Sequence, residues 1–402
     1  MTGKVADTSL ADAGRISFEW AKSRMPIIDK IAKKKKPLDG VRLGICLHVT
    51  KETSVLVMAA KKLGARISLC SANPLSAQND IAAFLYSQGI DVYAWQGQTI
   101  PEYRRCIRDV LGSRPSIIVD DGGDLHLAAH RTAAGGIIGG TEETTSGVKR
   151  LMALEKSGRL AYPVIAVNNA KTKHLFDNRY GTGQSTIDGI LRSTGILLAG
   201  LRVVVCGYGW VGKGVSARAR GMGAVVTVTE VDSVRALEAK MDGFEVKHLS
   251  DAAVSADLFI TCTGQTAVIR KEHIASMKDG AILANAGHFD VEIDVSYLYS
   301  NKHVLVRPNL ERFEIDGKKI YLIAKGRVAN LVCAEGNPPE VMALSFANQL
   351  LCILQIAENP VMPVKVHGVS QSIDQAVAEY ALDQLGIEID SLTEKQKKYQ
   401  QS

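Results

Sequence analysis

The sequence predicts an α/β protein with two doubly wound parallel-sheet domains joined by hinges, followed by a short C-terminal tail. Three observations lead to this fold class. A chain of 402 residues has room for two or three domains. Short apolar runs alternate with helical patterns along the chain, as they do in parallel sheets. The stretch from Val203 to Glu230 adds the most specific pattern, a strand, a glycine-rich turn, a helix and a second strand.

Composition narrows the class of protein. An apolar content of 46% and a charged content of 22% are typical of soluble globular proteins. No apolar run approaches the ~18 residues of a membrane span, and the first residues contain no apolar signal core. We therefore expect a cytoplasmic protein with no membrane partner.

The cysteines and the basic residues indicate neither a metal site nor a nucleic-acid partner. The seven cysteines form no C-x-x-C pair, and Cys46, Cys206 and Cys352 lie inside apolar segments, so we expect buried thiols and no metal site. The formal net charge is +6, and the visible basic cluster is Lys33 to Lys36. Because no aromatic residues interleave with this cluster, we expect a solvated helix end and no nucleic-acid partner.

The first half of the chain alternates helices and strands. Ile16 to Lys34 has helical spacing that is interrupted at Pro26. The expected strands are Val41–Val49, Arg66–Cys70, Asp91–Trp95 and Pro115–Val119, and the expected helices are Glu52–Leu63, Gln78–Ser87 and Pro101–Leu111. Polar residues at His48, at 71–73 and at Asp120–Asp121 follow strands directly. Open α/β sheets bind ligands at that edge, so the first domain carries a site.

The middle of the chain holds two further groups of polar residues. In the glycine-rich crossing from Gly135 to Lys149, Thr141 is expected to cap a helix whose first turn carries Glu142 and Glu143. The strand Val164–Val167 leads to Lys173 and Asp177, which would face the same side of a helix. Taken alone, this pair reads as a surface ion pair. The neighbours Asn178, Tyr180, Gly181 and Gly183 are more typical of a ligand loop.

The stretch from Val203 to Glu230 predicts a dinucleotide site. The apolar strand Val203–Cys206 is followed by Gly207, Gly209 and Gly212, with the G-x-G-x-x-G spacing that brings a pyrophosphate onto a helix N-terminus. The helix runs to Met222, and the strand Val225–Thr229 ends at Glu230. A carboxylate there can accept from both ribose hydroxyls and repels a 2′-phosphate, so the expected cofactor is NAD.

The alternation continues on both sides of this stretch. Helices are expected at Ser185–Leu197 and Val231–Met241, strands at Phe244–Lys247, Leu258–Thr261 and Ala281–Asn285, and further segments at Lys319–Ala324 and Val328–Cys333. His288 follows a strand end beside a glycine, which favours a functional role. The later helices, Val341–Ala357 and Asp374–Leu385, are expected to return to the first domain.

We therefore predict a substrate-binding and catalytic domain at 1–180, rejoined by 338–385, a Rossmann NAD domain at 181–337 and a tail at 386–402. The hinges would lie near Gly181 and Pro338. The NAD unit next to a site rich in acid/base groups predicts hydride chemistry combined with proton transfers. These groups outnumber what one alcohol oxidation needs: His48, Asp121, Glu143, Lys173, Asp177 and His288. From the residues alone, we expect an NAD-dependent enzyme acting on a hydroxylated substrate.

Six blocks of sequence resemble the adenosylhomocysteinase family. They are residues 48–53 (HVTKET), 120–125 (DDGGDL), 142–147 (EETTSG), 173–181 (KHLFDNRYG), 207–209 (GYG) and 287–294 (GHFDVEID). They occur in order, and the resemblance extends from about Ile16 to Tyr399. The run YGTGQS at 180–185 resembles the archaeal and thermophile branch.

The resemblance implies reversible hydrolysis of S-adenosyl-L-homocysteine to adenosine and L-homocysteine, with one tightly bound NAD per subunit. Bound NAD oxidises the ribose 3′-hydroxyl, which acidifies the 4′ C–H. The thiol is then eliminated from C5′, water adds, and the ketone is reduced again. The resemblance also implies a place in the methyl cycle of one-carbon metabolism and a homotetramer.

The resemblance also implies roles for individual residues. Lys173 and Asp177 would address the 2′/3′-hydroxyl edge, and Lys173 would need a lowered pKa to act as a base. Glu143 would hold the 2′-hydroxyl. His48 and Asp121 would manage protons at 4′, 5′ and sulfur, and either could take the 4′ proton.

Two further sets complete the implied site. Thr50, Glu52 and Thr53 would read the adenine edge, where a carboxylate acceptor suits a 6-amino group and argues against inosine. Other substrate-binding residues are Leu47, His288, Met342 and Phe346. The implied NAD-binding residues are Thr144, Thr145, Ser146, Asn178, Gly207, Gly209, Trp210, Val211, Gly212, Glu230, Thr263, Ala286, Gly287, His288 and Asn330.

The sequence departs from the family pattern at four places. Trp210 replaces a common acid, Thr182 a frequent cysteine, and Asn337 the usual histidine at the adenine side and hinge, so gating or base preference would differ. The chain ends soon after 393–396, without the longer tail that reaches a neighbouring NAD in many relatives. Open alternatives are an enzyme acting on another 5′-substituted purine nucleoside such as S-inosylhomocysteine, an enzyme that stops after elimination, a non-catalytic NAD-bound paralogue and a plain alcohol dehydrogenase.

Overall fold

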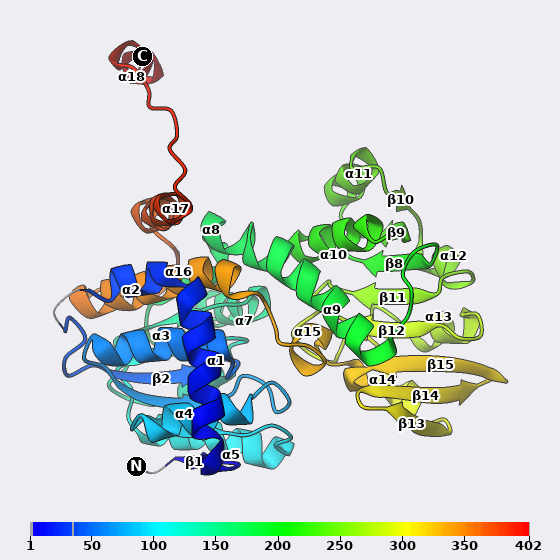
Figure 1. The fold of residues 1–402 in the computed structure, drawn as a ribbon, viewed down its shortest axis with the longest axis horizontal. Coiled ribbons are helices and arrows are strands. Elements are labelled where there is room, and N and C mark those ends of the chain that lie inside the picture. Colours follow the sequence, from blue (N-terminus) through cyan, green and yellow to red (C-terminus); the bar gives the residue numbers. More distant parts are fainter. Residues whose placement is uncertain (1–2, 34–35, 402) are drawn as a thin grey trace.

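The chain forms two lobes, each built around an eight-stranded sheet (Figure 1). The computed structural model describes residues 3–33 and 36–401, so Lys34 and Lys35 of the basic cluster lie outside the described residues. Apolar clusters pack on both faces of each sheet, which is the doubly wound arrangement that the alternating pattern predicts.

The first lobe contains an all-parallel sheet. Its strand order is β1 (Lys4–Val5), β4 (Asp91–Ala94), β3 (Arg66–Cys70), β2 (Arg42–Cys46), β5 (Ile117–Asp120), β6 (Gly139–Glu142), β7 (Val164–Ala166) and β16 (Val366–Gly368). Its helices are α1 (Ala11–Arg24), α2 (Pro26–Ile31), α3 (Lys51–Lys62), α4 (Asn79–Ser87), α5 (Ile100–Gly112), α6 (Asp124–Arg131), α7 (Thr145–Lys156) and α8 (Lys171–His174).

The second lobe contains a mostly parallel sheet. Its order is β10 (Glu245–Val246), β9 (Val225–Thr229), β8 (Arg202–Cys206), β11 (Leu258–Thr261), β12 (Ile282–Asn285), β15 (Lys318–Ile323), β14 (Leu310–Ile315) and β13 (His303–Arg307). Its helices are α9 (Thr182–Thr194), α10 (Trp210–Gly221), α11 (Ser233–Met241), α12 (Leu249–Ala253), α13 (Lys271–Ser276), α14 (Val295–Tyr299) and α15 (Ala329–Val332). The apolar run at Val328–Cys333 thus forms the short helix α15.

An antiparallel edge on the second sheet did not emerge from the sequence pattern. β14 pairs antiparallel with both β13 and β15. Asp316 and Gly317 connect β14 to β15, and both have positive φ angles, 49° and 76°. An Asp-Gly pair between two apolar strands is a strong hairpin signal, so the sequence did contain the information.

The predicted cap at Thr141 is wrong. Thr141 lies inside strand β6, which pairs with β5 and β7 on its two sides. The helix begins later, where the Thr144 side chain accepts a hydrogen bond from Gly147 N–H at 3.2 Å. The segment Gly139–Glu142 has little intrinsic strand propensity, and its central place in the sheet overrides that propensity.

Strand register places the predicted site residues at common edges. In the first sheet Cys46 lies opposite Asp120, which lies opposite Glu142. The residues just beyond these ends are His48, Asp121 and Glu143. In the second sheet the ends of β8, β9, β11 and β12 are in register in the same way, and they lead to Gly207, Glu230, Thr263 and Ala286. Parallel strands bring their carboxyl ends together, so each lobe presents one site-bearing edge.

The C-terminal helices return to the first lobe. α16 (Pro339–Glu358) packs on α2, α3 and α8, and α17 (Gln371–Leu385) packs on α16. By length and composition α16 could cross a membrane, but most of it is buried inside the protein, as in a core helix. α18 (Glu394–Gln401) stands clear of both lobes at the end of an extended segment (Figure 1). The domain limits near Gly181 and Pro338, at the starts of α9 and α16, stay predictions.

Candidate active site

A single cavity of about 1110 Å³ is lined by residues of both lobes. This volume exceeds the usual ~300–1,000 Å³ of a site for one small ligand, as a site for a cofactor and a nucleoside requires. All five predicted catalytic residues and all the predicted substrate-binding residues line the cavity. The predicted NAD-binding residues line it too, except Gly212.

The glycine turn after β8 fits a pyrophosphate. Gly207 has φ of 101°, a conformation that favours glycine. A Cβ on Gly212 would overlap the carbonyl oxygen of Gly207, so Gly212 closes the turn and does not reach the cavity. The nearest atom to a Cβ built on Gly209 is Arg235 Nη1 at 3.9 Å. Around the turn, the backbone N–H groups at the start of α10 therefore face open space, and Arg235 of α11 lies nearby.

Glu230 lies where the sequence placed it, at the end of β9 and on the cavity wall. Its Oε2 accepts from Tyr208 N–H at 2.7 Å, and its Oε1 accepts from Val231 N–H at 2.7 Å. These bonds orient a carboxylate that can receive ribose hydroxyls and would repel a 2′-phosphate.

Glu292 is a residue whose role sequence reasoning missed. It is 1% exposed and accepts from the Thr263 N–H at 2.9 Å, the Thr263 hydroxyl at 2.7 Å and the Gly264 N–H at 2.9 Å. It thereby fixes the cofactor loop that follows β11. An acid between two apolar residues, Val291 and Ile293, was the available signal, because a carboxylate that is buried among them requires partners.

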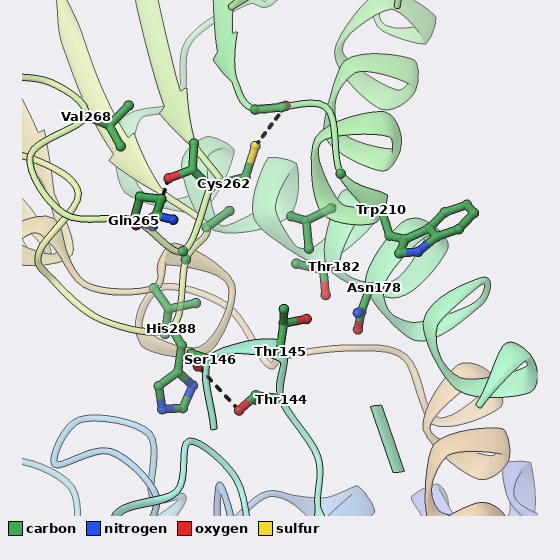
Figure 2. Close-up of a pocket in the computed structure, with 18 of the residues that line it drawn as sticks. Thr144, Thr145, Ser146, Asn178, Thr182, Trp210, Cys262, Gln265, Val268 and His288 are labelled. Carbon is green, nitrogen blue, oxygen red and sulfur yellow. Dashed lines mark hydrogen bonds between the residues drawn. The ribbon is translucent and has the colours of Figure 1, made fainter. Parts of the chain in front are cut away.

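Side chains of both lobes surround the cofactor space (Figure 2). Thr144, Thr145 and Ser146 come from the start of α7, opposite His288 of the second lobe. Trp210 stacks on His174 with ring centroids 5.0 Å apart, so the tryptophan that replaces a common acid makes a contact between the lobes.

Lys173, Asp177 and Glu143 form a buried cluster of charges. Lys173 Nζ lies 3.2 Å from Asp177 Oδ2 and 4.0 Å from Glu143 Oε1, and the three residues are 3–5% exposed. The surface ion pair interpretation is therefore wrong, and the ligand-loop interpretation stays a prediction, with Lys173, Asp177 and Asn178 on the cavity wall. A π-helical turn at Asp177–Gly181 aims Asp177 inward, next to Asn178, whose Oδ1 accepts from Lys173 Nζ at 2.9 Å.

The structure also corrects the expected pKa of Lys173. Burial alone lowers the pKa of a lysine, but the carboxylates of Asp177 and Glu143 outweigh burial and raise the pKa of Lys173. Burial raises the pKa of Glu143 to about 8, against the opposing effect of Lys173. Lys173 is thus an ammonium ion in the resting site, and Glu143 is the group closest to exchanging a proton near neutral pH.

Two polar residues that hold Asp177 were not predicted for this role. Asn337 Nδ2 donates to Asp177 Oδ1 at 2.7 Å, and Ser345 Oγ donates to Asp177 Oδ2 at 2.6 Å. Asn337 Oδ1 accepts from Ser185 Oγ at 2.8 Å. Asn337 therefore uses its hydrogen-bonding capacity at the cluster of Lys173, Asp177 and Glu143. Ser345 is a fully buried hydroxyl in the apolar helix α16, and such a group requires a partner.

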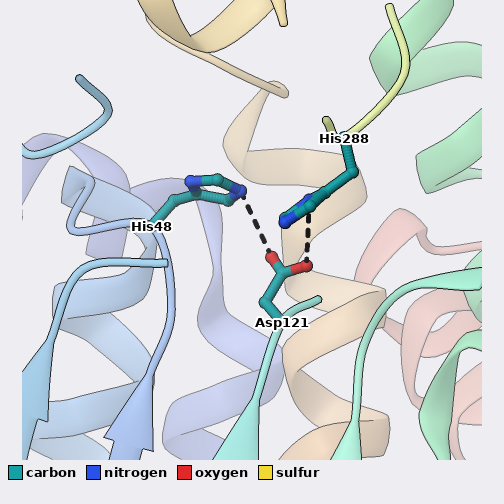
Figure 3. Close-up of side chains that lie close together, drawn as sticks. All are labelled: His48, Asp121 and His288. Carbon is teal, nitrogen blue, oxygen red and sulfur yellow. Dashed lines mark ion pairs between the residues drawn. The ribbon is translucent and has the colours of Figure 1, made fainter. Parts of the chain in front are cut away.

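His48, Asp121 and His288 form a second group (Figure 3). His48 Nε2 lies 3.5 Å from Asp121 Oδ2, and His288 Nδ1 lies 3.9 Å from Asp121 Oδ1. Burial lowers the pKa of His48 to about 4 and also lowers the pKa of His288, while Asp121 opposes both shifts. Both imidazoles are neutral at neutral pH, and one carboxylate lies between them. A Cβ on Gly122 would overlap His288, so this glycine lets the second lobe approach.

Within the part of the chain that the structure describes, two clusters present three possible metal ligands each. One is the His48, Asp121 and His288 group, and the other is Asp120, His126 and Glu142. In the second cluster both ring nitrogens of His126 are already hydrogen-bonded, to Tyr162 Oη at 3.0 Å and to the Thr141 carbonyl at 3.1 Å. We assign a metal to neither.

The remaining wall suits a flat base. Leu47, Met342 and Phe346 provide apolar surface, and Thr50, Thr53 and Glu52 provide polar atoms near the start of α3. Glu52 is 1% exposed, and burial raises its pKa above the ordinary value. A mostly apolar wall with a few placed polar groups is the usual form of a small-ligand site, and a nucleobase would fit such a wall.

Comparisons with known proteins agree with this geometry. Residues 2–135 match the family described as S-adenosyl-L-homocysteine hydrolase, and residues 178–336 match its NAD binding domain. Adenosylhomocysteinases of Aeropyrum pernix and Sulfurisphaera tokodaii are 54% and 55% identical over 99% of this chain and 98% of theirs. An S-inosyl-L-homocysteine hydrolase of Methanocaldococcus jannaschii is 48% identical over 98% of both chains. The chain therefore belongs to the S-adenosyl-L-homocysteine hydrolase family, whose cofactor is NAD.

Proposed function

We propose that the protein catalyses the reversible hydrolysis of S-adenosyl-L-homocysteine to adenosine and L-homocysteine. One observation carries the proposal. Two separate proton-transfer groups, Lys173–Asp177–Glu143 and His48–Asp121–His288, line the same cavity as the NAD-binding turn. A single alcohol oxidation would use one such group, whereas this reaction needs proton transfers at the 3′-hydroxyl and also at C4′ and C5′.

The first group handles the 3′-hydroxyl. NAD, when bound, supplies the oxidation at C3′ and the later reduction there. Because Lys173 rests as an ammonium ion, it takes the hydroxyl proton only after passing one of its own to a neighbouring carboxylate. Asp177 lies close enough to receive that proton, and Glu143 can receive it only at a pH above its own pKa of about 8, so the three residues act as one coupled base. Asn178 and Asn337 keep the members of the group in place.

The second group, His48, Asp121 and His288, transfers protons while the bond between C5′ and sulfur breaks. The His48–Asp121 pair takes the 4′ proton, the C–S bond breaks, and the sulfur leaves with the electron pair and receives a proton. Water then adds its oxygen to C5′, and C4′ regains a proton. A neutral imidazole can both accept and donate, which suits a site that reverses its direction within one turnover. His288 completes this group from the second lobe (Figure 3).

S-Inosylhomocysteine is the second candidate substrate, because the Methanocaldococcus jannaschii relative carries that name. Two observations favour the adenosyl substrate. Glu52 offers a carboxylate acceptor to a 6-amino group, and Asn337, the departure that prompted the alternative, is hydrogen-bonded to Asp177. A 6-oxo group would face the carboxylate of Glu52, and two acceptors oriented toward each other repel.

Release of free thiol tests the proposal. We expect NAD-loaded protein to release one thiol and one adenosine per S-adenosyl-L-homocysteine, with no accumulation of reduced cofactor under excess NAD. Intact substrate with no thiol would contradict the proposal. Steady growth of absorbance from reduced cofactor would indicate a dehydrogenase, and thiol release without adenosine would indicate an enzyme that stops after elimination.

We further propose that the protein is a cytoplasmic homotetramer. The last residue of α17 and the segment between α17 and α18 expose large apolar side chains, namely Leu385, Ile387, Ile389 and Leu392. Such a strip is costly in water and is buried when a second copy covers it. Light scattering on the purified protein should give four times the mass of one chain, and a monomer at all concentrations would contradict this assembly.

A further inference from the structure

Glu52 and Glu335 are both paired with the same cation, Lys51. Lys51 Nζ lies 3.3 Å from Glu52 Oε1 and 2.7 Å from Glu335 Oε2. Lys51 and Glu52 are the first two residues of α3, and Glu335 lies in the loop that joins α15 to α16. Glu52 lines the cavity, whereas Lys51 and Glu335 do not. The Glu52 carboxylate, which faces the nucleobase slot, is therefore paired with a cation, Lys51, that does not line the slot.

The other elements around α3 bring no second cation to Glu52. Among the described residues, Lys51 is the cation within 4 Å of its carboxylate. The arginines and lysines of the neighbouring helices α1 and α2 pair with other acids, namely Arg15 with Glu19, Lys22 with Asp29, Arg24 with Glu340 and Lys30 with Asp383. α16 faces the slot with the uncharged Met342 and Phe346. Lys51 is thus the charged group that opposes the effect of burial on Glu52.

The charge of Glu52 matters because two purines present opposite edges. Adenine offers a 6-amino donor and an N1 acceptor, whereas hypoxanthine offers a 6-oxo acceptor and an N1–H donor. A carboxylate accepts from the 6-amino group and repels the 6-oxo group. A neutral carboxyl both donates and accepts, so it can pair with either base. Burial raises the pKa of Glu52, and Lys51 opposes that rise, so removing Lys51 would move Glu52 toward the neutral form.

We propose that Lys51 is a specificity-determining residue, which makes the enzyme select 6-amino over 6-oxo purine nucleosides by keeping the Glu52 carboxylate charged. The inference rests on the proposed function and deepens it. Lys51 touches no substrate atom and acts through Glu52, so it is a positioning residue.

The test compares kcat/KM for S-adenosyl- and S-inosyl-homocysteine, measured as thiol release across acidic to neutral pH. The ratio of the two values cancels the ionisations that both substrates share, including those of Glu143 and the histidines. In the unmodified enzyme, the ratio should fall as pH drops through the raised pKa of Glu52. In Lys51→Gln the fall should occur at higher pH, and on the falling limb the ratio should be lower by about tenfold for each unit by which the pKa of Glu52 rises. Equilibrium binding of adenosine and inosine should show the same change.

Three variants separate the charge of Lys51 from other effects. Lys51→Arg keeps the charge and should keep the ratio. Glu335→Gln leaves Lys51 free to pair with Glu52 and should keep or increase the ratio. Lys30→Gln removes a lysine from a comparable ion pair, Lys30–Asp383 at 2.7 Å, away from the cavity, and should change nothing.

Three results would overturn the inference. One is a ratio that does not respond to Lys51→Gln while both substrates are hydrolysed, and another is a ratio that does not depend on pH. The third is a loss of selectivity in Glu335→Gln equal to that in Lys51→Gln, which would assign the effect to the link with the α15–α16 loop. If the proposed function itself fails, the unmodified enzyme releases thiol from neither substrate, which is a different outcome.

Discussion

Replacing Lys173 by alanine should abolish the reduction of bound NAD by adenosine while leaving NAD in place. Lys173 provides the one cation within 4 Å of Asp177 and Glu143 among the described residues, and it belongs to the base that accepts the 3′-hydroxyl proton. Loss of a positioned acid/base group costs about 10²–10⁴-fold in rate. The measurement is the absorbance of reduced cofactor after adding adenosine, together with the NAD content of the protein.

A matched control lies two residues away. Lys171 belongs to the same helix α8, but its side chain is exposed and does not line the cavity. Lys171→Ala should reduce cofactor at the normal rate. Because removal of Lys173 leaves two buried carboxyls without their cation, the melting temperature of Lys173→Ala should also fall, and more so at a pH where both are ionised. Cofactor reduction at the normal rate in Lys173→Ala would remove this residue from the mechanism.

Replacing Asp121 by asparagine should separate the two halves of the chemistry. Adenosine should still reduce the bound cofactor, because the Lys173 group is intact. Thiol release from S-adenosyl-L-homocysteine should fall by about 10²–10⁴-fold. Asp121 opposes the burial that lowers the pKa of His48 to about 4, so without its charge His48 accepts a proton even less readily. Stopped-flow cofactor reduction and steady-state thiol release on the same preparation measure the two halves.

The control for this variant is Asp109→Asn, an exposed position on α5 in the same lobe, which should leave both activities unchanged. If Asp121→Asn lost cofactor reduction and thiol release equally, the division of labour between the two groups would be wrong. If it lost neither, His48 alone would account for the proton transfers at C4′ and C5′.

Much of the fold was predictable because local patterns agreed with the tertiary structure. β3, β9 and β11 begin and end at the predicted residues, and α3 differs from its predicted bounds by one residue at each end. Each of these strands is a short, mainly apolar run with a polar residue directly next to at least one of its ends. The segment at Gly139–Glu142 is different, since two glycines and two polar residues form a strand only because β5 and β7 pair with it on both sides. No local propensity carries that information.

The sequence by itself determined the cofactor and the identity of the residues on the cavity wall. The spacing of Gly207, Gly209 and Gly212 and the acid at 230 depend on contacts within one short stretch, so they can be read along the chain. The charge states in the cavity were decided only by the tertiary structure. The spacing predicted that Lys173 and Asp177 lie on the same side of a helix. Whether that side is exposed or buried depends on residues far away in the sequence, such as Ser345 of α16. Burial and neighbouring charges set a pKa, and both arise from distant segments packing together, which is why Lys173 proved to be a buried ammonium ion.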